Sequence, residues 1–489
     1  MNCSVGQLRG LKKNHPASWM VLLVAAAIGM SGDRLVAATF QKDPPQPLNL
    51  ISIVTDDLAD WSLGSYGNRE SRTPNIDRLA HEGARFKNAF VPTPVCSASR
   101  ASFLTGLYST QTGITDFIHP GPERDLGLPG TLTTWPEVLR AHGYKTALIG
   151  KWHLGTAPRF HPTQHGFDIF YGFLGCCTDP MDPILEVDGK DQKFQGATAD
   201  LVTDEALRFI ENQATRPFAL SLHFREPHIK YVPVRDQDMA PFTRLDPTVP
   251  LAPGLDEQQI KNWTREYYAS VHSIDRNVGR LLQKLNDLQL SGHTIILFTS
   301  DHGYMIGHHG LHGKGNARWA AGGVPMYFPP PFPNMYEMSL RVPLLVRWPG
   351  IGKRGTEISE AISNVDTFAS VLGMLGIPMP KGVTQEGADF SPLLRGQRIP
   401  WRDAVFGQYD LHNSGLAFMR AIRTGDWKLV RYYGTNSLDM LFHLKDDPGE
   451  ATNLYGKSQT NQIQQSLQER LTAWMQSIDD PILRWVNSR

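Results

Sequence analysis

The chain has 489 residues, and its 48 Lys and Arg residues balance its 48 Asp and Glu residues. A balanced charge gives no field that would attract a nucleic acid or an anionic membrane, so neither is expected as a partner. The length exceeds what a single core usually reaches, which predicts one large domain with a smaller one beside it. Four cysteines are too few for a disulfide framework.

The N-terminal segment has the pattern of a secretory signal peptide. Lys12 and Lys13 precede the uncharged run 19–30, and Val36-Ala37-Ala38 stands directly before Thr39. The apolar run is shorter than the roughly 20 residues that cross a bilayer, so cleavage is favoured over the alternative of a membrane anchor. The pattern therefore predicts a signal peptide at 1–38, export to the periplasm or the cell exterior, and no membrane span in the mature chain.

Strand and helix patterns alternate over the first 300 residues. Short runs rich in Ile, Val and Leu predict buried strands, and longer periodic segments predict helices. In chain order the predicted elements are a strand at 48–55, helices at 97–108 and 134–141, strands at 144–149 and 218–222, a helix at 266–290 and a strand at 294–300. The alternation predicts an α/β fold with a large, mostly parallel central sheet flanked by helices, and ligands at the carboxyl ends of the strands.

The C-terminal part has a different pattern. A Gly- and Pro-rich segment at 317–335 predicts a long surface loop. Two strand patterns that flank Gly425 predict a hairpin, and an amphipathic helix follows. These elements are strands at 417–424 and 426–433 and a helix at 462–478. They predict a smaller C-terminal α+β subdomain at 400–489, after a catalytic domain at 47–395.

A thiol and a guanidinium lie one helical turn apart at Cys96 and Arg100. The Pro-rich segment 91–95 precedes a helical pattern, so Cys96 is predicted at a helix N-terminus, where unpaired N–H groups favour an anion. Arg100, at i+4, can fork onto an oxyanion or hold the group at position 96 in place. We interpret the pair as a catalytic centre for an anionic ester. The alternative is an inert buried cysteine beside a surface arginine.

Carboxylates and an imidazole end two of the predicted strands. Asp56 and Asp57 follow the first strand, and Asp301 and His302 follow the strand at 294–300. Together they could share one divalent cation, and so many oxygen ligands suit Ca²⁺ or Mg²⁺, while His302 leaves Mn²⁺ or Zn²⁺ open. The alternative role for two aspartates after a strand is to cap the following turn.

Lys151 and His153 end a predicted strand that runs into a turn. In a period-2 segment their side chains point to the same side, where a cation and an imidazole suit charge stabilisation and proton transfer. The alternative is a solvated lysine and a hydrogen-bonded histidine. His223 is predicted to be structural. The three histidines within 308–312 are left unassigned, since His-rich loops are often simply polar.

These motifs, in this order, resemble the signatures of the type I formylglycine-dependent sulfatases, which belong to the alkaline phosphatase superfamily and include the arylsulfatases. The matching segments are Cys96-Ser97-Ala98-Ser99-Arg100 with Phe103 to Gly106, Gly143 to Leu154, Pro227-His228, Lys314, Met335 to Leu344, and Leu441 to Leu454. The resemblance spans roughly residues 47–455. It implies a secreted sulfatase with the α/β fold predicted above.

The resemblance also implies the roles of individual residues. A maturation enzyme would convert Cys96 to formylglycine, whose hydrated form attacks the sulfur of a sulfate monoester. The cation, Ca²⁺ with Mg²⁺ or Mn²⁺ as alternatives, would be held by Asp56, Asp57, Asp301 and His302. The other implied roles are steadying the nucleophile for Arg100, neutralising the sulfate oxygens for Lys151 and Lys314, and proton transfer for His153 and His228.

The substrate implied is a sulfated carbohydrate, with a small aryl sulfate as an artificial one. Two departures from the family pattern stand out: Ala98 replaces a common Pro, as in the form read by radical maturation enzymes, and His302 stands where Asn is frequent. Two alternatives remain. One is a phosphate or phosphonate monoester hydrolase on the same scaffold, and the other is a non-catalytic glycan-binding protein with a decayed site.

Overall fold

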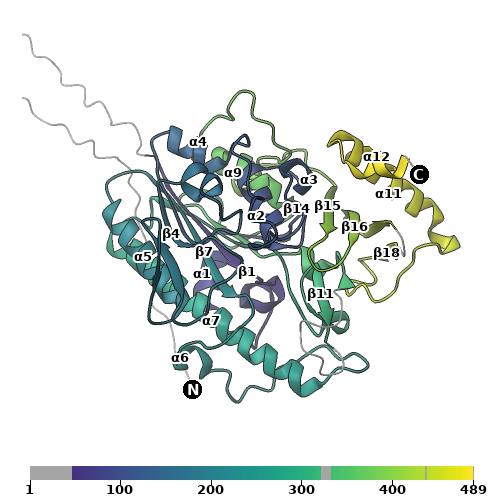
Figure 1. Ribbon diagram of the computed structural model, residues 1–489, viewed down its shortest axis with the longest axis horizontal. Helices are drawn as coiled ribbons and strands as arrows, with labels where there is room; N and C mark the ends of the chain where they lie inside the picture. The colour runs from purple at the N-terminus through teal and green to yellow at the C-terminus, as the bar shows by residue number, and fades with distance from the viewer. Residues whose placement is uncertain (1–46, 321–331, 435–437, 488–489) are drawn as a thin grey trace, which may run out of the picture. The chain divides into compact units, whose positions relative to one another are not determined.

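A ten-stranded sheet is the largest feature of the computed structural model, which describes residues 47–320, 332–434 and 438–487. The predicted signal peptide lies outside the described residues. The strand order is β14-β2-β13-β8-β1-β7-β3-β4-β5-β6 (Figure 1). The bounds of these strands are β14 (Thr356–Ser363), β2 (Ala84–Phe90), β13 (Leu344–Arg347), β8 (Thr294–Ser300), β1 (Asn49–Asp56), β7 (Phe218–Pro227), β3 (Lys145–Lys151), β4 (Ile169–Phe173), β5 (Ile184–Val187) and β6 (Lys190–Lys193).

The five central strands, β8 to β4 in sheet order, run parallel, and antiparallel pairs occur toward both edges. Strand β1 is buried along its whole length. Alternate residues face opposite sides of a strand, so Leu50 and Val54 join one core and Ile51 and Ile53 join the other. This is how an almost continuous apolar run packs in a parallel strand covered on both faces.

Helices cover both faces of the sheet (Figure 1). On the face with Leu50 the main helices are α2 (Cys96–Thr105), α4 (Trp135–Ala141) and α9 (Thr367–Leu375). On the face with Ile51 they are α1 (Pro74–Glu82), α5 (Thr198–Asn212) and α7 (Glu257–Asp287). The predicted α/β fold with a mostly parallel sheet is therefore confirmed.

One strand and one helix are longer in the structure than the sequence patterns predict. Strand β7 continues to Pro227 instead of ending at Leu222, because Phe224 packs into the core and the polar residues around it are also buried. Helix α7 begins at Glu257, nine residues before the predicted start at 266. Its N-terminus is capped by the Asp256 side chain, which accepts a hydrogen bond from the Gln259 N–H at 3.1 Å.

The predicted long loop at 317–335 is wrong at both ends. Its first residues form β11 (Asn316–Trp319) and its later ones form β12 (Phe332–Pro333), which pair in a small antiparallel sheet with β9 (Met305–Ile306) and β10 (Leu311–Gly313). Residues 321–331 lie outside the described residues. The Asn334 side chain then donates a hydrogen bond to the Lys314 carbonyl at 2.8 Å. The segment therefore fixes the backbone of a predicted site residue.

A separate four-stranded antiparallel sheet makes up the smaller C-terminal α+β subdomain. It contains the predicted hairpin, and helix α11 (Asn461–Ser477) packs against it. Its strands are β15 (Ala404–Leu411), β16 (Ala417–Thr424), β17 (Trp427–Tyr433) and β18 (Met440–His443). The boundary near residue 400 stays a prediction. None of the helices in the described ranges has the length and apolar character needed to span a membrane.

Asp275 of α7 caps the N-terminus of α1. Its Oδ1 accepts hydrogen bonds from the backbone N–H groups of Asn75 and Ile76, both at 2.8 Å. We expect Asp275→Ala to lower the free energy of unfolding by about 1–3 kcal/mol, because both donors lose their acceptor. Chemical denaturation measures the change. Asp275→Asn keeps one acceptor oxygen and should cost less, so equal losses in the two variants would contradict the capping role.

Candidate active site

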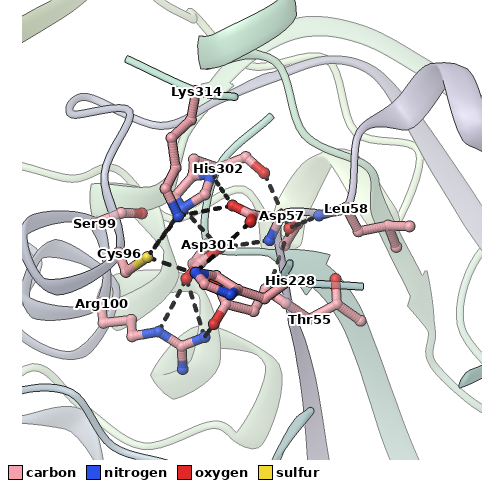
Figure 2. A network of polar contacts seen from close by, with 12 residues as sticks. Thr55, Asp57, Leu58, Cys96, Ser99, Arg100, His228, Asp301, His302 and Lys314 are labelled. Carbon is pink, nitrogen blue, oxygen red and sulfur yellow. Dashed lines mark hydrogen bonds and ion pairs between the residues drawn. The ribbon is translucent and has the colours of Figure 1, made fainter. Parts of the chain in front are cut away.

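The predicted site residues that Figure 2 labels lie together beyond the carboxyl ends of β1 and β8. Asp56 ends β1, and Asp57 follows it with a φ of 68°, in the left-handed region. Asp301 follows β8, and its backbone N–H donates to the Thr55 carbonyl at 3.0 Å. Because neighbouring parallel strands end at the same edge, two aspartates 244 residues apart in sequence become neighbours: the Asp57 N–H donates to Asp301 Oδ1 at 3.3 Å.

Cys96 is the first residue of α2, as predicted, and its side chain is buried. The Sγ atom lies 3.0 Å from Lys314 Nζ, 3.3 Å from His302 Nε2 and 3.5 Å from Asp56 Oδ1. Burial and the Asp56 charge raise the pKa of the thiol, but the charges of Lys151, Lys314 and His302 outweigh them and lower it to about 7. Position 96 therefore lies in a cationic environment that favours an anion.

The acidic residues form a buried group that is balanced by cations. Burial opposes the ionisation of Asp56, yet the charges of Lys151 and Arg100 hold its pKa well below the usual value. Burial together with the Asp56 charge instead raises the pKa of Asp301. Buried carboxylates this close repel one another unless a positive charge lies between them.

The donor set fits a divalent cation. Ligand atoms of Asp56, Asp301, His302 and Cys96 all lie within 4.8 Å of one another, and those of Asp56, Asp57 and His228 do so as well. Three carboxylates with one imidazole match the oxygen-rich ligation of Ca²⁺, Mg²⁺ or Mn²⁺.

The Arg100 guanidinium contacts the acidic group and the end of β3. Its Nε and Nη2 both lie 3.0 Å from Asp301 Oδ2, and its Nη1 donates to the Lys151 carbonyl at 3.3 Å. It connects α2, which carries position 96, to the segment after β8 and to the end of β3.

Lys151 is fully buried and ion-paired with Asp56. The strand that carries it ends there, and His153 has a left-handed backbone with a φ of 59°, so the period-2 argument does not reach His153. The His153 Nε2 lies 3.1 Å from the Ile118 carbonyl. Burial and the Lys151 charge hold its pKa well below the usual value, so the imidazole is neutral.

His228 and Lys314 border the site from two further segments (Figure 2). Lys314 Nζ donates to Asp57 Oδ1 at 2.8 Å, and its side chain is 11% exposed. The His228 Nε2 lies 3.8 Å from Asp57 Oδ2, and its side chain is 16% exposed. Both side chains thus reach the acidic group and keep some access to solvent, which the fully buried Lys151 lacks.

Two further residues support the site from behind. The Tyr267 hydroxyl of α7 donates to the Asp57 carbonyl at 2.7 Å and accepts from the Ala59 N–H at 3.0 Å, so it supports the left-handed turn at Asp57. Nothing in an amphipathic helix pattern marks it. His223, predicted to be structural, lies against the Lys151 carbonyl and the Arg100 guanidinium. Burial lowers its pKa to about 3, so it is a neutral brace.

The unassigned histidines do not form a metal site among the described residues. His309 stacks on Tyr336 with ring centroids 3.8 Å apart, and the His312 Nε2 lies 2.6 Å from the Tyr231 hydroxyl. The adjacent Cys176 and Cys177 are free thiols with sulfur atoms 2.8 Å apart.

An acidic group, two lysines and a helix-borne cysteine thus meet at the carboxyl ends of the central strands, an arrangement that suits the hydrolysis of an anionic ester beside a divalent cation. Comparison with known proteins narrows the class. The family model described as "Sulfatase" matches residues 48–377, and the model "N-sulphoglucosamine sulphohydrolase, C-terminal" matches residues 332–477. The chain therefore belongs to the sulfatase family, and it is a sulfuric ester hydrolase.

Individual relatives cover most of the chain. An N-acetylglucosamine-6-O-sulfatase from Bacteroides thetaiotaomicron is 28% identical over 94% of this chain and 91% of its own. An ulvan-active sulfatase from Formosa agariphila is 30% identical over 94% of this chain and 87% of its own. A solved structure described as a complex with D-glucosamine-2-N,6-O-disulfate aligns with a TM-score of 0.78 and 26% identity, covering 89% of this chain and 99% of that one.

Proposed function

We propose that this protein hydrolyses the sulfate monoester of a sulfated carbohydrate, with a formylglycine derived from Cys96 as nucleophile and Ca²⁺ as the cation. The observation that carries the proposal is the position of Cys96: its Sγ lies 3.0 Å from a lysine ammonium and 3.5 Å from a carboxylate of the acidic group. An attacking oxygen at that position would lie beside the Lys314 ammonium and beside the acidic group that is proposed to hold the cation. The relatives that act on sulfated amino sugars and on ulvan support a carbohydrate substrate.

Asp56, Asp57, Asp301 and His302 are proposed to hold the cation. When bound, the cation and the formylglycine would together supply a hydroxyl nucleophile of lowered pKa beside a neutralised sulfate. Lys151 holds Asp56 in place from the buried side, and Arg100 does the same for Asp301.

Lys314 and His228 are proposed to act on the substrate directly, because their side chains keep some exposure. The Lys314 ammonium would neutralise sulfate oxygens as charge develops on them. Burial lowers the pKa of His228 to about 3, so its imidazole is neutral without substrate. A bound sulfate would raise that pKa, since a nearby anion favours the imidazolium, and the proton can then pass to the leaving alcohol oxygen. His153, buried and neutral, is proposed as the other proton-handling group.

Export and maturation belong to the same proposal. Residues 1–38 would direct export, and a formylglycine-generating enzyme would act on the motif from Cys96 to Arg100, with Ala98 favouring a radical maturation enzyme. An N-terminal sequence of the mature protein that begins near Thr39 would support cleavage of the signal peptide.

The proposed reaction is tested by comparing nitrophenyl sulfate with nitrophenyl phosphate, and by ion chromatography of sulfate released from a panel of sulfated glycans. We expect a kcat/KM for the sulfate well above that for the phosphate, and sulfate release from at least one glycan. Faster turnover of the phosphate would favour the phosphate monoester alternative. Sugar binding without release of either anion would favour the glycan-binding alternative.

Removing the cation should lower both activity and stability. Three buried carboxylates repel one another once the cation is gone, so we expect chelation to abolish turnover and to lower Tm by several degrees, with both restored by added Ca²⁺. Differential scanning fluorimetry measures the shift. In Asp301→Asn the shift on adding Ca²⁺ should shrink, whereas in Asp426→Asn, on an exposed turn of the C-terminal sheet, it should not. A chelated enzyme with unchanged Tm and activity would contradict the proposed cation site.

A further inference from the structure

Two adjacent thiols, Cys176 and Cys177, lie on the segment that follows β4 and have no role in the proposed reaction. Cys177 is exposed, and Cys176 is half-buried. Their sulfur atoms lie 2.8 Å apart, so little movement separates them from the length of about 2.0 Å of a sulfur–sulfur bond. The other cysteine of the described ranges, Cys96, is buried against the acidic group. A bond between the two adjacent sulfur atoms is therefore the short-range reaction open to this pair.

Cys177 is the more reactive thiol of the pair. Its hydrogen bond with Cys176 and the charges of Lys151 and Arg225 lower its pKa to about 6, against the opposing effects of burial and Asp56. The same hydrogen bond raises the pKa of Cys176. With a thiolate beside a thiol, one sulfur can attack a disulfide and the other can resolve the product. Cys177 also lines a cavity of about 640 Å³, so a small molecule has room beside its sulfur.

The segment that carries the two thiols is hydrogen-bonded at both ends to segments of the candidate active site. Before the thiols, the Leu174 carbonyl accepts from the His153 N–H at 3.1 Å. After them, the Thr178 carbonyl accepts from the Arg225 Nε at 2.8 Å. Arg225 is 2% exposed, and its own carbonyl accepts from the His228 N–H at 3.1 Å. The thiols therefore lie between the backbone contacts of the two histidines that are proposed to handle protons.

A disulfide between Cys176 and Cys177 would distort this segment. The Cα atoms of consecutive residues are about 3.8 Å apart across a trans peptide, whereas bridged cysteines usually have Cα atoms about 4.4–6.8 Å apart. The backbone must therefore deform when the bond forms, and a strained disulfide is readily reduced again. Because Leu174 and Thr178 lie at most two residues from the thiols, their hydrogen bonds to His153 and Arg225 take up the deformation.

We propose that Cys176 and Cys177 form a reversible oxidation site, whose closure to a disulfide slows the hydrolytic reaction. The oxidant is a small-molecule disulfide. The Cys177 thiolate attacks one of its sulfur atoms and releases a first thiolate, which leaves a mixed disulfide on Cys177. The Cys176 thiol loses its proton, attacks the Cys177 sulfur and releases a second thiolate. Two protein thiols are thereby oxidised, and the small disulfide is reduced to two thiols. The effect on turnover rests on the proposed function, whereas the closure does not.

The closure is tested with dithiobis-nitrobenzoate, an aryl disulfide that releases a coloured thiolate. The tryptic peptide 160–190, prepared without reductant, contains both cysteines and no other. In the wild type, mass spectrometry should find this peptide two hydrogen atoms lighter and without adduct. In Cys176→Ala, which lacks the resolving thiol, the peptide should keep a nitrobenzoate adduct on Cys177. A wild-type peptide that keeps adducts, or that does not react, would overturn the proposal.

Turnover of nitrophenyl sulfate measures the effect on the site. We expect closure to lower kcat about fivefold or more, because hydrogen bonds that support His153 and His228 weaken, and dithiothreitol should restore it. The control is the double variant Cys176→Ala/Cys177→Ala, which should show wild-type turnover and no response to the reagent. Unchanged kcat in the closed wild type, or an equal loss in the double variant, would overturn the proposal.

If the reduced protein hydrolyses no sulfate ester, the proposed function fails, and hydrogen exchange decides the oxidation site in its place. Peptides that contain His153 and His228 should exchange faster in the closed form than in the reduced form. Equal exchange in the two forms would overturn the proposal.

Discussion

Replacing Cys96 by alanine should lower kcat for nitrophenyl sulfate by a factor of about 10⁴ or more. Alanine cannot be converted to an aldehyde and offers no attacking atom, while the acidic group and Lys314 remain. Cys96 packs in a buried environment, and alanine fits the same space, so the fold should persist. Steady-state kinetics and thermal unfolding measure the two effects.

The control for Cys96→Ala is Cys176→Ala. It removes another thiol, on the segment after β4, without changing position 96. We expect wild-type turnover of nitrophenyl sulfate in this variant. Full activity in Cys96→Ala would exclude position 96 as the source of the nucleophile.

Replacing Lys314 by methionine should lower kcat about 10²- to 10⁴-fold with a smaller effect on stability. The Lys314 ammonium lies between the Asp57 carboxylate and the Cys96 sulfur, where charge would develop on the sulfate oxygens. Methionine has a similar length without the charge, so the substitution removes the electrostatic contribution and keeps most of the packing. The kcat for nitrophenyl sulfate and the Tm are the readouts.

Lys428→Met is the matched control for Lys314→Met. Lys428 is fully buried, and its Nζ lies 2.6 Å from Glu450 Oε1 and 3.4 Å from Glu337 Oε1 in the C-terminal part. Its loss leaves two buried carboxylates with less compensation and should cost about 3–5 kcal/mol of unfolding free energy. Turnover of the folded fraction should stay unchanged. A fall in kcat of the same size in both lysine variants would contradict a direct role for Lys314.

The sheet could be predicted from the sequence because a buried parallel strand is a continuous apolar run. Strand β8 has the bounds that the pattern predicts, and the acidic residues follow β1 and β8 as expected. Strand β7 was cut short because Arg225 and Glu226 are polar, and only tertiary contacts make such residues acceptable inside a strand. The Pro and Gly content of 317–335 predicts a loop, because it hides the short pairing of β11 with β12.

The residues that lie at the site could be predicted from the sequence, but the contacts and the exposure of each side chain could not. Lys151 and Lys314 look alike in sequence, yet one is fully buried against Asp56 and the other keeps a partly exposed side chain. Arg100 was expected on the face of Cys96, but its contact with Asp301 depends on strand order, which no local pattern encodes. Tyr267 carries no local signal, because its role depends on where α7 crosses the end of β1.

The most direct test of the proposed formylglycine nucleophile is mass spectrometry of the tryptic peptide 88–100, which contains Cys96. The enzyme is purified from a host that holds a formylglycine-generating enzyme, and the peptide is probed with an aldehyde-reactive hydrazide and a thiol-reactive reagent. The proposed function predicts that residue 96 reacts as an aldehyde, in a fraction that rises in proportion to sulfatase activity across preparations. A fully active preparation in which residue 96 reacts only as a thiol would contradict it.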